Sequence, residues 1–153
     1  MKLMRPYMFE ERTFELMGRA MELAGRAKGA PVGALVAGPE GEVVSEGCND
    51  RSSPFLHAEA IALRRAQEEL GASGFKECTL FCTLEPCAMC AGAALLFKVG
   101  RIVFGAWDPE AGACGSVWDI PRQAPGGWKA EVVGGFREKE CSKILKDGFS
   151  RIR

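Results

Sequence analysis

Two short stretches, far apart in the chain, carry the side chains that most constrain how it can fold. His57-Ala58-Glu59 supplies an imidazole, and Pro86-Cys87-Ala88-Met89-Cys90 supplies two thiols. One histidine and two cysteines are ligands that zinc favours, and they are one short of a closed tetrahedral site. The fold must therefore bring the two stretches together. We expect one Zn²⁺ held by His57, Cys87 and Cys90, with water in the fourth position.

Glu59 is the candidate catalytic residue of this site. It lies two residues after the histidine, where a carboxylate can move a proton to and from the bound water. A carboxylate in the first turn of a helix is also favoured by the helix dipole alone. Its position beside a metal ligand favours the catalytic interpretation.

Two other interpretations of the same residues exist. The histidine, the only one in the chain, could be a satisfied core residue, with the cysteines as buried apolar side chains. Alternatively, Cys78 and Cys82 could join the C-x-x-C pair in a closed structural site with four cysteines. Those two cysteines lie on or beside one expected strand and should both point into the core.

Composition fits one domain over residues 1–153, since 153 residues can build a sizeable core. The formal net charge is zero, which argues against a chain-wide attraction to nucleic acid but allows a local basic patch. No apolar signal segment is present in 1–12, and the longest apolar run, 87–97, is too short to span a membrane. We therefore expect a cytoplasmic protein whose seven cysteines are mostly reduced.

Hydrophobic periodicity predicts alternating helices and strands, and hence an α/β class with one mixed sheet covered on both faces. The unit from Thr79 to Gly105 should be a parallel strand–helix–strand unit, and Ala106–Gly127 a long irregular, functional segment. Helices are expected at Phe9–Lys28, His57–Leu70, Cys87–Lys98 and Arg137–Arg151, and strands at Val32–Ala37, Glu42–Glu46, Thr79–Thr83, Arg101–Gly105 and Ala130–Val133.

Four stretches give the chain a family resemblance. They are Pro31-Val32-Gly33-Ala34, HAE at 57–59, TLEPCAMCAGA at 83–93 and VFGAWDPEAGACGS at 103–116. Together they resemble the bacterial tRNA-specific adenosine deaminase family of the cytidine/deoxycytidylate deaminase superfamily. The resemblance implies a cytidine-deaminase-like three-layer α/β/α sandwich with a five-stranded mixed sheet, a homodimer, and conversion of the wobble adenosine of a tRNA anticodon loop to inosine.

The resemblance also assigns residues. It implies zinc binding by His57, Cys87 and Cys90, with Glu59 as the proton shuttle. Substrate contacts are implied for three further residues, namely Asn49 at the base, Asp108 near the flanking nucleotide and Phe149 at the wall of the anticodon site. Asn49 would otherwise be a turn former, although its amide can both donate to and accept from a base edge.

Some features depart from the family pattern. The loop before HAE is short, and Gly148 stands where a second aromatic is common. A deaminase of free bases or nucleosides, of the guanine or cytosine type, is therefore the alternative function. A zinc module without activity is a second alternative, which the retained Glu59 argues against. For an RNA substrate we expect Arg151 and Arg153 to contact phosphates, although a solvated helix end would carry the same residues.

Overall fold

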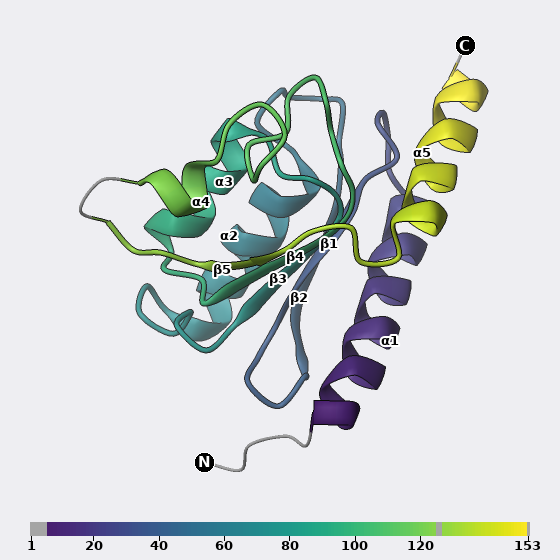
Figure 1. Ribbon diagram of the computed structural model, residues 1–153. Coiled ribbons are helices and arrows are strands. Elements are labelled where there is room, and N and C mark those ends of the chain that lie inside the picture. The colour runs from purple at the N-terminus through teal and green to yellow at the C-terminus, as the bar shows by residue number, and fades with distance from the viewer. Residues whose placement is uncertain (1–5, 125–126, 153) are drawn as a thin grey trace.

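The computed structural model describes residues 6–124 and 127–152. After the consecutive strands β1 and β2, helices and strands alternate along this part of the chain (Figure 1). The elements are α1 (Pro6–Ala24), β1 (Gly33–Ala37), β2 (Val43–Cys48), α2 (Ala58–Leu70), β3 (Thr79–Leu84), α3 (Ala88–Leu96), β4 (Arg101–Ala106), α4 (Ile120–Gln123), β5 (Glu131–Val133) and α5 (Glu138–Ile152).

The strands form one mixed sheet of five strands in the order β2-β1-β3-β4-β5. β1 is antiparallel to both β2 and β3, whereas β3, β4 and β5 are parallel to one another. The predicted fold class and the predicted parallel unit β3–α3–β4 are therefore confirmed. Parallel neighbours need a crossover, which here is α3.

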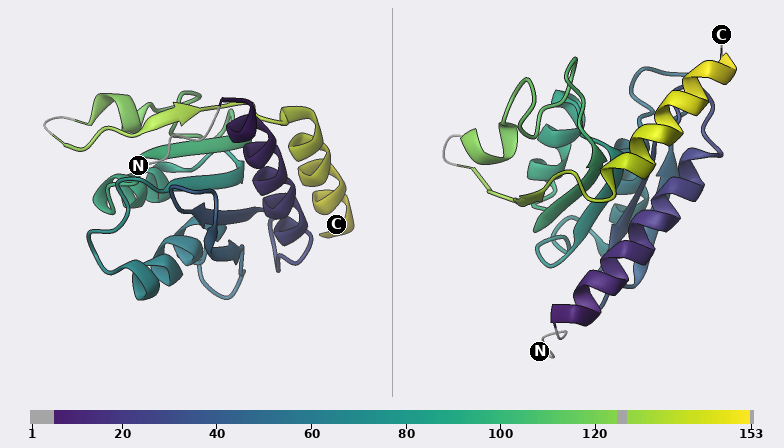
Figure 2. Two further views of the ribbon diagram at one scale, coloured as in Figure 1. Left: turned by 90° about the horizontal axis from the view of Figure 1, so that it is seen from below. Right: turned by 45° about the vertical axis from the view of Figure 1, so that its right-hand side comes forward.

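Helices cover both faces of the sheet, so the molecule has three layers. α2, α3 and α4 lie on one face, and α1 and α5 lie side by side on the other (Figures 1 and 2). Successive strand residues point to opposite faces. Accordingly, Leu80 and Cys82 pack in the core under α2 and α3, and Phe81 packs in the core under α1 and α5.

Several expected boundaries shift by one to three residues, and two expectations about helices were wrong. α1 was expected to reach Lys28 but ends at Ala24. Glycine at position 25 is a poor helix former, and the Lys28 amide donates instead to the Asn49 carbonyl at 3.0 Å. The segment 106–127 was expected to be irregular but contains the short helix α4, which carries a proline in its first turn, where proline is tolerated.

The antiparallel pairing of β1 places the future site at one edge of the sheet. The start of β1 lies beside the ends of both β2 and β3, because Gly33 pairs with Cys48 and donates its amide to the Thr83 hydroxyl at 3.1 Å. The segments that follow β2 and β3 therefore leave the sheet at the same edge. These are the segments that lead into α2 and α3.

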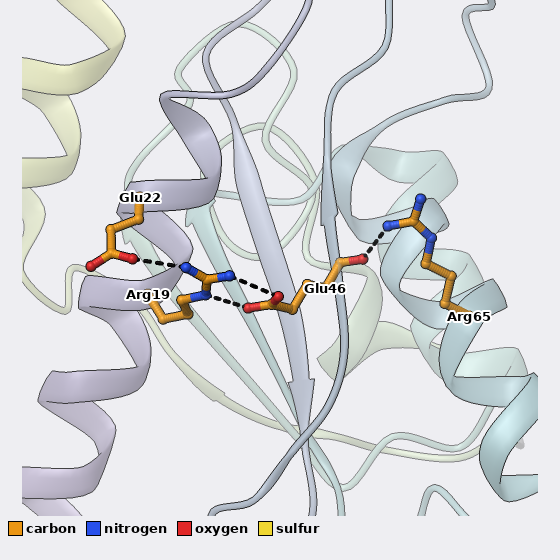
Figure 3. Close-up of polar contacts among 4 residues, drawn as sticks. All are labelled: Arg19, Glu22, Glu46 and Arg65. Carbon is orange, nitrogen blue, oxygen red and sulfur yellow. Dashed lines mark hydrogen bonds and ion pairs between the residues drawn. The ribbon is translucent and has the colours of Figure 1, made fainter.

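Two arginines bind the edge strand β2 to the neighbouring helices α1 and α2 (Figure 3). Arg19 of α1 binds the Glu46 carboxylate through Nε and through Nη2, the latter at 2.9 Å, and also binds Glu22 at 2.9 Å. On α2, Arg65 donates to the Glu46 backbone carbonyl at 2.8 Å. An edge strand exposes unpaired carbonyl groups, and Arg65 satisfies one of them.

We expect Arg19→Met to lower the free energy of unfolding more than Glu22→Gln does. The first change removes the two-bond contact between α1 and β2, whereas the second removes only an exposed pair within α1. Urea unfolding at low salt and at 1 M salt measures both. The effect of Arg19→Met should shrink at high salt, since partly exposed ion pairs are screened. Equal effects of the two changes would contradict this role for Arg19.

Candidate metal and active site

The structure brings the three predicted metal ligands together. His57 is the residue before α2, Cys87 is the residue before α3, and Cys90 lies in the first turn of α3. His57 Nδ1 is 3.5 Å from Cys87 Sγ and 3.6 Å from Cys90 Sγ. All three candidate ligand atoms lie within 4.8 Å of one another. The local cause is that both helices begin at the same sheet edge.

These distances fit a tetrahedral zinc ion. Zinc–nitrogen and zinc–sulfur bonds in a tetrahedron place nitrogen and sulfur about 3.6 Å apart, close to the two separations found. Among the histidine, cysteine and acidic side chains of the described residues, His57, Cys87 and Cys90 are the group close enough together to hold a metal ion. Cys78 and Cys82 are instead packed in the core under α2 and α3, so the four-cysteine alternative is not assembled.

The two thiols are electrostatically coupled. A hydrogen bond with Cys90 lowers the pKa of Cys87 to about 5, and the same bond raises the pKa of Cys90 above its ordinary value. Cys87 is thus the more acidic of the two thiols, and both sulfurs lie within 3.6 Å of His57 Nδ1. A divalent cation favours the thiolate form of both, because metal ligation requires deprotonated sulfur.

Glu59 is buried within the first turn of α2, with 4% of its surface exposed. Burial is the main cause that raises its pKa to about 7, and the nearby Cys87 sulfur raises it further. A carboxyl group that titrates near neutrality can both accept and return a proton. The environment of Glu59 therefore suits the predicted proton shuttle.

Asn49 lies near these groups because its side chain binds the first residue of α2. Its Oδ1 accepts the Ala58 amide hydrogen at 2.7 Å, which satisfies one free donor at the helix start. Since the backbone partner is a donor, the bound atom must be the oxygen. The side-chain NH₂ group is therefore the group with which Asn49 can bind a ligand.

Glu85 is a central residue that the sequence reasoning missed. It is 1% exposed, and its carboxylate accepts backbone amides from Asp108, Cys114 and Ser116, each at 3.0 Å, as well as the Ser116 hydroxyl. These bonds fold the loop after β4 back over the end of β3. Glu85 immediately precedes Pro86-Cys87 and so anchors the start of α3.

Gly112 shows how tightly the loop wraps this carboxylate. A Cβ atom at Gly112 would lie 2.3 Å from Glu85 Cδ, so a larger residue would clash. The loop stretch GACGS and the glutamate of LEPC are therefore one structural unit. Two features of the sequence could have indicated this unit. One is a glutamate between a buried strand and the start of a helix, and the other is a glycine-rich stretch at 112–116 to which no role had been given.

The other expected substrate residues have the following positions. Asp108 uses its carboxylate locally, accepting the amides of Glu110 at 3.0 Å and Ala111 at 3.2 Å. Phe149 lies on α5 with 47% of its surface exposed. The side chains of Arg151 and Arg153 lie outside the described residues. The substrate roles of Asp108 and Phe149 remain predictions.

Comparison with known proteins identifies the family. Residues 10–106 match the cytidine and deoxycytidylate deaminase zinc-binding region. The chain is 44% identical over 142 residues to tRNA(Ile)-lysidine synthase of Deinococcus deserti, covering 91% of this chain but 26% of that protein. It is 37% identical over 151 residues to the tRNA-specific adenosine deaminase of Haemophilus influenzae, covering 95% of this chain and 86% of the relative.

Solved structures agree. A chain from work on A-to-I editing by tRNA:A34 deaminases at the wobble position superimposes with a TM-score of 0.78 and 32% identity, covering 86% of this chain and 99% of that one. Guanine deaminase from Nitrosomonas europaea gives a TM-score of 0.68 and 25% identity, covering 95% and 93%. The chain belongs to the cytidine and deoxycytidylate deaminase family, whose cofactor is zinc. Within it, the chain is a relative of the tRNA-specific adenosine deaminases.

The extent of these matches differs between relatives. The chain spans about a quarter of the length of the first lysidine synthase relatives that it matches, whereas it spans most of the adenosine deaminases. In the described part of the chain, no helix is both long and apolar enough to cross a membrane.

We expect Glu85→Gln to lower the free energy of unfolding by about 3 kcal/mol, because its amide group would meet backbone donors that need an acceptor. Thermal or urea unfolding measures the change, and Glu68→Gln on the exposed side of α2 is the matched control. Proteolysis should also cut the 108–116 loop faster in Glu85→Gln. Unchanged stability would show that the loop does not depend on this carboxylate.

Proposed function

We propose that residues 1–153 form a single zinc-dependent deaminase domain that converts adenosine to inosine, at the wobble position of a tRNA anticodon loop. The observation that carries the proposal is a buried Glu59 beside three assembled metal ligands. The choice of substrate rests on sequence similarity. The similar proteins include a tRNA-specific adenosine deaminase and a tRNA(Ile)-lysidine synthase, and both names refer to tRNA. We further propose that the protein is cytoplasmic and homodimeric.

The ligand set assigns the chemistry. His57, Cys87 and Cys90 would hold zinc and leave a position open. When bound, zinc lowers the pKa of a coordinated water and so supplies the nucleophile at neutral pH. In the net reaction water adds its oxygen to C6 of the base, the bond from C6 to the exocyclic nitrogen breaks, and ammonia leaves.

Glu59 moves the protons of this reaction. Its carboxylate accepts a proton from the attacking water and delivers it to the departing amine. The raised pKa of Glu59, about 7, suits both directions of transfer at neutral pH. Burial keeps bulk water away from the carboxyl group, so that the proton passes to the substrate.

The remaining site residues position the base. Asn49, whose oxygen is held by the Ala58 amide, presents its NH₂ group to a ring-nitrogen acceptor of the purine. Asp108 lies near the flanking nucleotide, and the exposed ring of Phe149 packs against the loop. An anticodon loop suits such a site because its bases are already unstacked and need little energy to be extruded.

A deaminase of free bases remains the second candidate function. It is favoured by the likeness to guanine deaminase, which extends over nearly the whole of both chains. The formal net charge of zero points the same way. The adenosine deaminase likeness is closer in both identity and superposition, and we therefore prefer tRNA.

The homodimer is supported by exposed apolar side chains at the end of α3 and just before α4. Leu96 at the end of α3 is 85% exposed, and Val117 and Trp118 before α4 are 47% and 60% exposed. Contacts link α3 and α4 directly. Apolar patches on a monomer commonly mark protein interfaces.

The function is tested by incubating purified protein with anticodon stem-loops and, separately, with guanine, cytosine and their nucleosides. We expect inosine in a stem-loop and little ammonia from the free compounds. Glu59→Gln should reduce the rate by roughly 10²–10⁴-fold while retaining zinc, because proton transfer is lost.

Two results would contradict this function. Efficient deamination of free guanine or cytosine without inosine in any stem-loop would support the second candidate instead. Near-native turnover by zinc-loaded Glu59→Gln would assign proton transfer to another group.

Metal content tests the ligand set. We expect about one zinc per chain, and Cys90→Ser should lose most of it because a serine hydroxyl does not replace a thiolate. Cys78→Ser, altered at a buried cysteine outside the ligand group, is the matched control and should keep its zinc. Full retention of zinc by Cys90→Ser would exclude Cys90 as a ligand.

The dimer is tested by sedimentation at micromolar concentration. We expect wild-type protein to sediment as a dimer and Leu96→Glu to shift it towards the monomer, because the charge would be buried without a partner. Phe14→Glu, at an exposed apolar residue of α1 on the other face of the sheet, should remain dimeric. A monomeric wild-type protein would overturn the proposal.

A further inference from the structure

A groove of about 410 Å³ lies between the end of α1 and α5, outside the metal site. We call it the α1–α5 groove. Its apolar wall includes Pro31 and Ile144, and its polar side chains are Lys28, Arg51 and Asp147. None of the metal-binding or proton-transfer residues described above lines it, and the proposed function leaves it without a role.

Backbone pairing brings residues 28 and 51 together and links them to the segment that carries Asn49. Lys28 donates its amide to the Asn49 carbonyl at 3.0 Å, and the Arg51 amide donates to the Lys28 carbonyl at 2.8 Å. The side chain of Asn49 meanwhile holds the Ala58 amide next to His57. Lys28 and Arg51 are therefore connected through the backbone to Asn49, the residue proposed to bind the base.

Lys28 and Arg51 are exposed, and neither forms an ion pair among the described residues. The nearest acidic neighbour on their own segment, Asp50, uses its carboxylate to accept the Ser52 amide at 2.9 Å. Both cations lower the pKa of Asp50 through their charge, although hydrogen bonds from Ser52 lower it more. The two basic groups thus remain available to an anionic ligand.

Gly148 lets α5 form the far wall of the groove. A Cβ atom there would lie 2.3 Å from Pro31 Cγ, so α5 approaches the start of β1 more closely than a helix with a side chain at this position could. Pro31 occupies the space that a side chain at position 148 would need. The close packing of this wall of the groove therefore depends on glycine at position 148.

We propose that the α1–α5 groove binds a nucleotide that flanks the target adenosine on the same RNA strand. Lys28 and Arg51 bind its phosphate, and the sugar or base lies over Pro31 beside Gly148. Asp147 offers an acceptor for a base or ribose donor. The proposal rests on the proposed function, of which it specifies the substrate path. Charge complementarity favours the phosphate over a neutral ligand, because the lining carries two cations, Lys28 and Arg51, and one anion, Asp147.

The first test is binding of a fluorescent anticodon stem-loop by Lys28→Ala/Arg51→Ala. We expect about tenfold weaker binding and a smaller salt dependence, since removing one phosphate interaction with single-stranded RNA reduces the slope by about 0.7. Arg64→Ala/Lys129→Ala removes the same charge from exposed positions outside the groove and should bind as wild type. Zinc content and thermal unfolding confirm that each variant is folded.

The second test finds the phosphate. Stem-loops are made with a single neutral methylphosphonate at each linkage around the target adenosine in turn. At one linkage the wild-type protein should lose about tenfold in affinity, and Lys28→Ala/Arg51→Ala should lose little more there, because both changes remove the same interaction. Ala27→Phe, which puts a ring into the groove, should weaken the stem-loop at every linkage.

The outcomes separate the groove from the function. Equal losses in the Arg64→Ala/Lys129→Ala control, or no linkage at which the two changes overlap, would overturn the proposed groove contact while inosine formation stands. Wild-type protein that binds the stem-loop without forming inosine would overturn the function alone, since the binding tests still report on the groove. Wild-type protein that does not bind the stem-loop would overturn both.

Discussion

The buried carboxylate of Glu85 is the interaction on which the site half of the molecule depends. A buried charge is costly unless hydrogen bonds surround it, and here the bonds come from a loop more than twenty residues downstream. The loop in turn closes around the carboxylate so tightly that position 112 must be glycine. Since Glu85 directly precedes Pro86-Cys87, the same bonds fix where α3 starts and hence where the two thiols lie.

The second constraint is the direction of β1. Because it runs antiparallel to β2 and β3, the ends of those two strands share an edge, and the helices that follow begin there together. Two helix N-termini facing one cation would repel it, and the thiolate forms of Cys87 and Cys90 would supply the compensating negative charge. The electrostatics of the site therefore require the cysteines to be thiolates, which is the form that a metal ion favours.

The sequence was sufficient for those parts of the fold that follow from local patterns. Periodicity and breakers located every strand and the four long helices, and the spacing of His57, Cys87 and Cys90 predicted a site that the structure assembles. Errors arose where a distant segment decided the outcome. Gly25 is a local signal for the end of α1, but the pairing of Lys28 with the strand exit at Asn49 is contained in no local rule.

The role of Glu85 was missed for the same reason. A glutamate before a helix is ordinarily a helix-dipole partner, and only the three-dimensional path of the 108–116 loop shows which amides it receives. At position 148 the unusual residue was visible in the sequence, but its structural role was not. Its glycine was visible in the sequence as a missing aromatic, but its meaning lies in the 2.3 Å approach to Pro31. The absence of a side chain there lets α5 pack closely against Pro31, just before β1. A single glycine can thus set the position of a helix, and α5 at this point forms one wall of the α1–α5 groove.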